Sequence, residues 1–117
     1  MKRSRLRPQS AKRQAEADER FDVRSVTWHR AGGHCEAERL VPAVACGGPL
    51  DVDEIAPRSA LPGGHLDPAN TALLCRRHHD WKGANPEAAH AVGLRRWSWE
   101  GAPAEHERLV APPATLG

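Results

Sequence analysis

Residues 71–79 read Thr-Ala-Leu-Leu-Cys-Arg-Arg-His-His, and they predict the centre of the fold. Its first half is a short apolar run that suits a strand. The residues from 76 to 82 suit a helix, which the glycine and proline that follow would end. Cys75 and His78 lie at the turn between the two, with a spacing that lets both side chains converge on one metal ion. The stretch therefore predicts a strand, a helix and a metal site at their junction.

A second strand is predicted at Leu50–Ile55, where apolar and acidic residues alternate. This period of two is typical of a half-buried strand, and a regular pleat directs Asp51 and Asp53 to one face and Glu54 to the other. A further short helix is predicted at Pro86–Val92. The expected fold is a small α+β domain in which a two-stranded ribbon and a helix carry the site.

The composition favours a metal over disulfides as the source of stability. The chain has 117 residues, with 39% hydrophobic and 4% aromatic residues, so the core must be thin. An odd number of cysteines, 3, beside 7 histidines argues against a secreted disulfide scaffold. We predict a structural zinc site in which the four ligands are Cys35, Cys46, Cys75 and His78. The alternative is three reduced cysteines that only pack in the core.

A second group of chemically active residues comprises Asp53, Glu54, Asn70, His78 and His79. A carboxylate at the end of a strand and a histidine on the next helix suit a divalent ion. Adjacent residues on a helix point about 100° apart, so one ion cannot easily bind both histidines. The two histidines are therefore expected to serve two different sites.

The order of these motifs resembles the HNH endonucleases of the ββα-metal fold, in the zinc-binding form common among phages. The resemblance covers about residues 30–97. It rests on Gly32-Gly33-His34-Cys35, Asp51-Val52-Asp53-Glu54-Ile55-Ala56-Pro57-Arg58-Ser59, Asp67-Pro68-Ala69-Asn70 and Leu74-Cys75-Arg76-Arg77-His78-His79. It implies a metal-dependent endonuclease that nicks DNA phosphodiester bonds with little sequence preference.

The resemblance also implies roles for individual residues. Asp53 and His79 match the ligands of a catalytic Mg2+, Mn2+ or Ni2+ ion, and Asn70 matches the asparagine that braces the catalytic loop. The three cysteines match zinc ligands. His78 stands where the family mostly has a fourth cysteine, and zinc accepts imidazole there.

Glu54 departs from the family pattern, because the family has a histidine there that acts as general base. Glutamate near pKa 4.3 is a weaker base than histidine near 6.5, by about two pKa units. Three interpretations stay open. Glu54 serves as a substitute base, or it marks an inactive copy, or His65 acts instead.

Basic residues supply the expected contacts to nucleic acid, namely Arg58, Arg76, Arg77 and Lys82. For Arg95 and Arg96, a phosphate contact and a solvated surface charge are equally favoured. Residues 1–20 are expected to form a flexible basic arm with a peripheral helix, for which the alternative is a solvated tail.

The nuclease domain is expected at residues 21–100 and a loose Pro/Ala-rich tail at residues 101–117. A short helix at Arg24–Ala31 is expected to end at Gly32-Gly33. The apolar residues expected to anchor the domain are Phe21, Val23, Val26, Trp28, Trp97 and Trp99.

The expected partner is DNA and, by resemblance only, a phage terminase. No stretch has the length of a membrane span, and no targeting signal is evident. We therefore expect the bacterial cytoplasm, with a phage or prophage gene as the source. The main alternative function is a catalytically inactive, zinc-stabilised DNA-binding accessory module. A third is a structural zinc protein that binds another protein, which leaves Asp53, Asn70 and His79 without a role.

Overall fold

Strands β1 (Leu50–Glu54) and β2 (Thr71–Cys75) form a two-stranded antiparallel sheet at the centre of the molecule. The computed structural model describes residues 10–57, 63–104 and 109. The register pairs Leu50 with Cys75 at one end and Glu54 with Thr71 at the other. Both strands confirm the sequence prediction within one residue.

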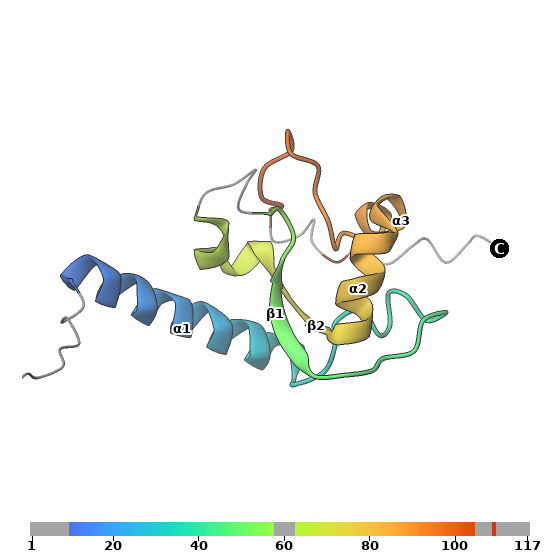
Figure 1. Ribbon diagram of the computed structural model, residues 1–117, viewed down its shortest axis with the longest axis horizontal. Coiled ribbons are helices and arrows are strands. Elements are labelled where there is room, and N and C mark those ends of the chain that lie inside the picture. The colour runs from blue at the N-terminus through green and yellow to red at the C-terminus, as the bar shows by residue number, and fades with distance from the viewer. Residues whose placement is uncertain (1–9, 58–62, 105–108, 110–117) are drawn as a thin grey trace, which may run out of the picture.

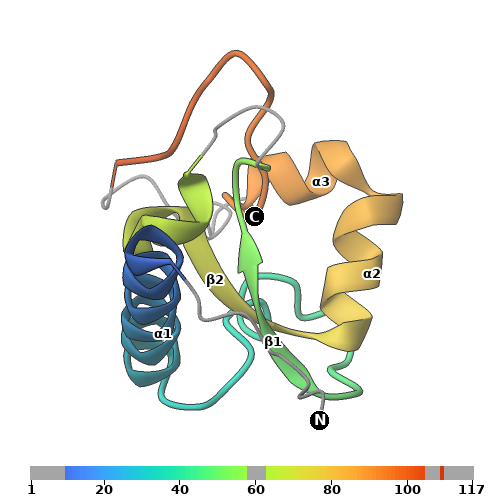
Figure 2. The same ribbon diagram turned by 60° about the vertical axis from the view of Figure 1, so that its left-hand side comes forward.

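Helices cover the sheet from two sides (Figures 1 and 2). Helix α1 (Ala11–Ala31) lies along one side, and α2 (Arg76–Ala84) and α3 (Pro86–Ala91) lie on the other. Two short 3-10 helices, Gly64–Leu66 and Pro68–Asn70, lead into β2. The small α+β class is as expected.

Helix α1 is one continuous helix, where the sequence suggested a peripheral helix before residue 20 and a separate short helix at Arg24–Ala31. Ser10 caps its first turn by accepting a hydrogen bond from the Arg13 N–H. Gly32 ends it in the left-handed conformation, as expected. The helix therefore runs across the boundary expected at residue 20. Residues 1–9 of the expected basic arm, and Arg58, lie outside the described residues.

The α1 helix contacts the sheet through few side chains. Val23 and Thr27 are buried. The hydroxyl groups of Thr27 and Thr71 form a hydrogen bond of 2.7 Å. Phe21, Val26 and Trp28, which were expected to anchor the domain, are exposed instead. The expectation failed because a helix with few apolar residues touches its neighbour along a narrow stripe.

The main core lies between the sheet, the loop that carries Cys35, and α3. Its largest buried members are Leu40, Ile55, Leu74 and Leu94. Leu109 also packs into this core, from the segment expected to be a loose tail. Among the described residues, no helix combines the length and apolar character needed to span a bilayer.

Candidate metal centre and candidate active site

The first candidate site is a cluster of Cys35, Cys46, Cys75 and His78, which the fold brings together from three segments. The Nδ1 atom of His78 lies 3.5 Å from the Cys35 sulfur, 3.6 Å from the Cys46 sulfur and 3.2 Å from the Cys75 sulfur. A tetrahedral zinc ion with ordinary bond lengths separates a sulfur and a nitrogen ligand by about 3.5 Å. The cluster can therefore hold a structural metal such as zinc.

Backbone contacts position the cluster at the start of α2. The Cys75 N–H donates to the Cys35 sulfur, and the N–H of His78 donates to the Cys75 sulfur. The loop that carries Cys46 reaches α2 because the N–H of Arg77 donates to the Gly47 carbonyl. Gly48 has φ 82°, and a Cβ atom there would lie 2.7 Å from the Cβ of Arg76. Only glycine allows this close approach.

The loop after Cys35 is fixed to the free edge of β2 by Glu36. Its backbone N–H donates to the Leu73 carbonyl, and its carboxylate accepts from the Leu73 N–H. Both backbone groups of Leu73 are thus satisfied without a third strand. Glu36 carries no signal in the sequence that would have identified this role.

The three thiols have different proton affinities. Desolvation by burial raises the pKa of Cys35. Desolvation, together with the charge and hydrogen-bond interactions of the other two thiols, raises the pKa of Cys46 to about 12. Burial alone would raise the pKa of Cys75, but the N–H groups of Gly47 and His78 and the His78 side chain outweigh it and lower the value to about 6. These contacts favour the thiolate form of Cys75, and a bound cation would favour ionisation of all three thiols.

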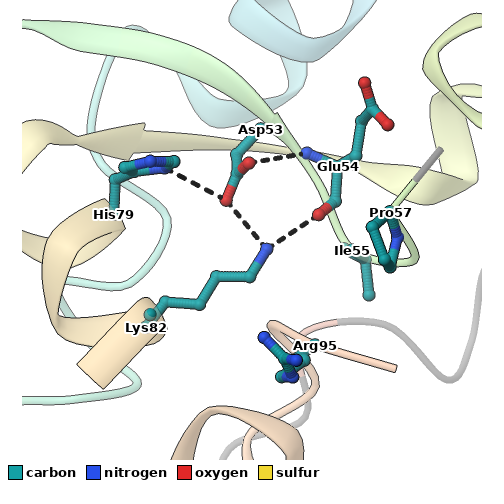
Figure 3. A pocket seen from close by; sticks show the side chains of 8 residues that line it. Asp53, Glu54, Ile55, Pro57, His79, Lys82 and Arg95 are labelled. Carbon is teal, nitrogen blue, oxygen red and sulfur yellow. Dashed lines mark hydrogen bonds and ion pairs between the residues drawn. The ribbon is translucent and has the colours of Figure 1, made fainter. Parts of the chain in front are cut away.

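The second candidate site is a pocket of about 470 Å³ at the far end of β1 (Figure 3). Asp53 and His79 line it from the strand and from the first turns of α2, with His79 Nδ1 lying 3.6 Å from Asp53 Oδ2. His78 is fully buried, whereas 49% of the His79 side chain is exposed. The adjacent histidines therefore face different surroundings, as the helical period predicts.

Lys82 lines this pocket and is largely buried, rather than lying on the outer surface. Its ammonium donates to Asp53 Oδ2 at 2.8 Å and to the Glu54 carbonyl at 2.7 Å (Figure 3). Only 8% of the residue is exposed. An ion pair that is largely shielded from water is stronger than a surface pair. Lys82 therefore holds the carboxylate that was expected to bind an ion.

Glu54 and Asp53 project from opposite faces of β1. Figure 3 shows the Glu54 carboxylate pointing away from Asp53 and Lys82. On that face Glu54 lines a small hollow with residues of α1, and His65 lines the same hollow. The pleat was predicted correctly: Glu54 also lines the Asp53 pocket, but its carboxylate points away from Asp53, on the side of the hollow that His65 lines.

Asn70 is a buried brace between the two strands. Its side chain accepts from the Ala56 N–H at 2.8 Å and donates to the carbonyls of Ala56 and Gly64. Its own carbonyl accepts from the Ile55 N–H. These contacts fix the turn that follows β1, which forms one wall of the Asp53 pocket.

No family model, curated protein or solved structure matches this chain. The candidate roles therefore rest on the geometry of the residues. A carboxylate and an imidazole beside open space suit a divalent ion whose other ligands are water or substrate oxygens. Asp53 and His79 fit that pattern, provided that the Lys82 ammonium leaves Asp53 Oδ2.

The other arginines that were considered as nucleic-acid contacts lie on two different surfaces. Arg76 and Arg77 are exposed at the start of α2, and Arg76 pairs with Asp80 at 3.4 Å. Arg95 lines the Asp53 pocket, and its Nε atom is buried without a hydrogen-bond partner among the described residues. The sequence did not decide between a phosphate contact and a surface charge for Arg95. The sequence feature that distinguishes Arg95 is its position two residues before Trp97, whose ring it contacts.

Proposed function

We propose that this chain is a metal-dependent endonuclease of the HNH type that nicks DNA. The proposal is carried by one observation, the convergence of Asp53 and His79 on an open pocket lined by Lys82 and Arg95. Two cationic side chains beside a carboxylate and an imidazole suit a phosphodiester better than a neutral ligand. The order of motifs that resembles the HNH family supports the same conclusion.

In this mechanism Asp53 and His79 would hold a Mg2+, Mn2+ or Ni2+ ion, which would supply positive charge beside the phosphate. Hydrolysis would add the hydroxyl of a water molecule to phosphorus and release the 3′ oxygen as an alcohol. Arg95 binds a non-bridging phosphate oxygen from the opposite wall of the pocket. The Lys82 ammonium, once released from Asp53, remains close enough to neutralise charge on the same phosphate. Asn70 keeps the turn after β1 in place.

The test is relaxation of supercoiled plasmid by the zinc-loaded chain with each of the three ions. The parent is expected to nick, and His79→Ala is expected to lower the rate at least about a hundredfold. His29→Ala removes an exposed histidine of α1 and serves as the matched control. Equal nicking by the parent and His79→Ala would show that the activity comes from another site.

The second candidate function is a DNA-binding module without catalysis. Two observations favour it, namely the Lys82 contact to Asp53 and the position of the Glu54 carboxylate across the strand. Under this alternative the parent binds DNA in a salt-dependent way and does not nick it. Because the side chain of residue 54 projects away from Asp53, Glu54→His is then not expected to restore nicking.

A further inference from the structure

An aromatic stack at the end of α3 is built from His90 of that helix and from Trp97 and Trp99, which follow it. The rings of His90 and Trp97 are nearly parallel, with centroids 4.5 Å apart and an angle of 10°. The Trp97 and Trp99 rings follow at 6.3 Å and 26°. Trp99, which was expected to be an apolar anchor, is 79% exposed. The stack therefore ends in a large indole ring that faces solvent.

The loop that carries the stack is held by polar contacts. The Glu100 carboxylate accepts from the Trp97 N–H and contacts His90 Nε2 at 2.8 Å. These contacts lower the pKa of Glu100, the backbone N–H of Trp97 contributing most. Arg96 donates to the carbonyls of Glu100 and Gly101. A ring held in this way loses little conformational freedom when a ligand binds.

Arg95 connects the aromatic stack to the Asp53 pocket. Its guanidinium lies 5.5 Å from the centroid of Trp97, and the residue lines the pocket that Asp53 and His79 share. The N–H of Arg96 donates to the carbonyl of Ile55, which fixes the loop to the end of β1. In Figures 1 and 2 this orange loop arches over that end of the sheet. A strand with one phosphate in the pocket thus has an aromatic surface beside it.

We propose that Trp99 is the stacking surface for an unpaired DNA base, and that Arg95 binds the backbone between this base and the Asp53 pocket. The inference rests on the proposed function and adds the substrate class: single-stranded DNA or DNA with unpaired bases. Parallel rings followed by a cation match the alternation of planar bases and anionic phosphates in a single strand. A base inside a duplex has both faces covered by its neighbours and cannot stack on Trp99.

The experiment measures binding by fluorescence anisotropy, using the zinc-loaded full chain with His79→Ala to prevent cleavage. One probe is a short labelled oligothymidylate, and the other is an abasic strand of equal length and charge. Trp99→Ala is expected to weaken oligothymidylate binding about tenfold and to leave abasic binding unchanged. Trp99→Phe is expected to retain most of the affinity. Trp28→Ala, on α1, is the control for loss of a surface tryptophan.

Salt dependence separates the two proposed contacts. Arg95→Gln is expected to weaken both probes and to reduce the slope of log Kd against log salt by about 0.7. Trp99→Ala is expected to leave that slope unchanged, because the indole ring contacts no phosphate. The two variants therefore have different signatures even where their affinities are similar.

Three results would overturn the inference. The first is equal weakening of both probes by Trp99→Ala, and the second is no weakening of either. The third is a concentration-dependent dimer in sedimentation that Trp99→Ala abolishes, since Trp99 would then bind a second copy. The proposed function fails separately, if the parent does not nick plasmid while the base-dependent binding persists.

Discussion

The Cys3His cluster and the Asp53 pocket are supplied by neighbouring residues of α2, yet they are built differently. In the cluster, buried side chains converge at distances that suit a bound metal. In the pocket, the side chains are partly exposed and an internal ammonium holds the carboxylate. A closed set of ligands supports the fold, whereas an open set leaves coordination positions for a substrate. Under the proposed function, His78 stabilises the fold and His79 takes part in the chemistry.

The largest expected effect separates these two histidines by stability. His78→Ala removes a buried ligand, and structural zinc contributes about 10–16 kcal/mol of apparent binding free energy in small zinc domains. This binding free energy exceeds the stabilisation that so small a hydrophobic core supplies. The His78→Ala variant is therefore expected to be unfolded at room temperature. Circular dichroism, with zinc content measured in parallel, checks this.

His79→Ala is the matched control, because it changes the next residue of the same helix. Its free energy of unfolding is expected to stay within about 0.5 kcal/mol of the parent. A folded His78→Ala chain without zinc would refute the assignment of stability to the cluster.

The next effect concerns Asn70, which supports the wall of the pocket. Asn70→Ala leaves the buried N–H and carbonyl of Ala56 without their partner, so unfolding is expected to become easier by about 3 kcal/mol. Asn85→Ala, which removes one exposed hydrogen bond to the Trp81 carbonyl, is expected to cost less than about 1 kcal/mol. Urea denaturation of the zinc-loaded variants measures both. Equal losses of unfolding free energy in Asn70→Ala and Asn85→Ala would show that Asn70 does not support the turn after β1.

Lys82 gives a smaller effect, seen in metal affinity. Lys82→Met removes the cation that competes for Asp53 and keeps a side chain of similar length. Hydrogen bonds to charged groups contribute about 1.5–3 kcal/mol, so Mn2+ affinity is expected to rise about tenfold. Calorimetry on zinc-loaded protein tests this. Arg76→Met removes an exposed charge from the same helix and therefore controls for the change in net charge. An unchanged or lower Mn2+ affinity in Lys82→Met would show that Lys82 does not compete with the ion for Asp53.

The smallest effect is the pH response of Asp51. Burial alone would raise its pKa, but the Val52 N–H and the Arg24 guanidinium, 3.0 Å away, outweigh it and lower the pKa. A lowered pKa stabilises the fold at neutral pH, and this contribution is lost as the pH falls through the folded value. Because the pair is exposed, it contributes less than about 1 kcal/mol.

NMR titration of the Asp51 carboxyl carbon measures this pKa. At pH 4 an ordinary aspartate is about 40% protonated, whereas Asp51 is expected to be less protonated than that. Arg24→Gln is expected to bring its midpoint back toward the ordinary value. A midpoint that does not move would show that the ion pair has no effect.

Local patterns predicted the parts of the molecule that depend on neighbours in sequence. The alternation of apolar and acidic residues predicted β1 and the side on which Glu54 lies, and the Cys75–His78 spacing predicted half of the Cys3His cluster. Cys35 and Cys46 were the weaker half of the prediction because their spacing is unusually long, and the place of Cys46 depends on the Gly47–Arg77 contact. Whether a polar residue near a site faces the pocket or solvent depends on tertiary packing.

Three further errors concern exposure or helix continuity. Trp99 and Phe21 were expected as apolar anchors, but both are exposed. The continuity of α1 was missed because its exposed surface has no apolar period. Lys82 was expected at the surface, and no sequence pattern identifies its contact with the Glu54 carbonyl.

The central claim is that His78 and His79 serve two different metals, and electron paramagnetic resonance of Mn2+ added to the zinc-loaded chain tests it most directly. The account predicts one bound Mn2+ per chain in the parent, and none in His79→Ala, whose zinc content equals that of the parent. Mn2+ bound equally by the parent and His79→Ala, or zinc lost from His79→Ala, would contradict it.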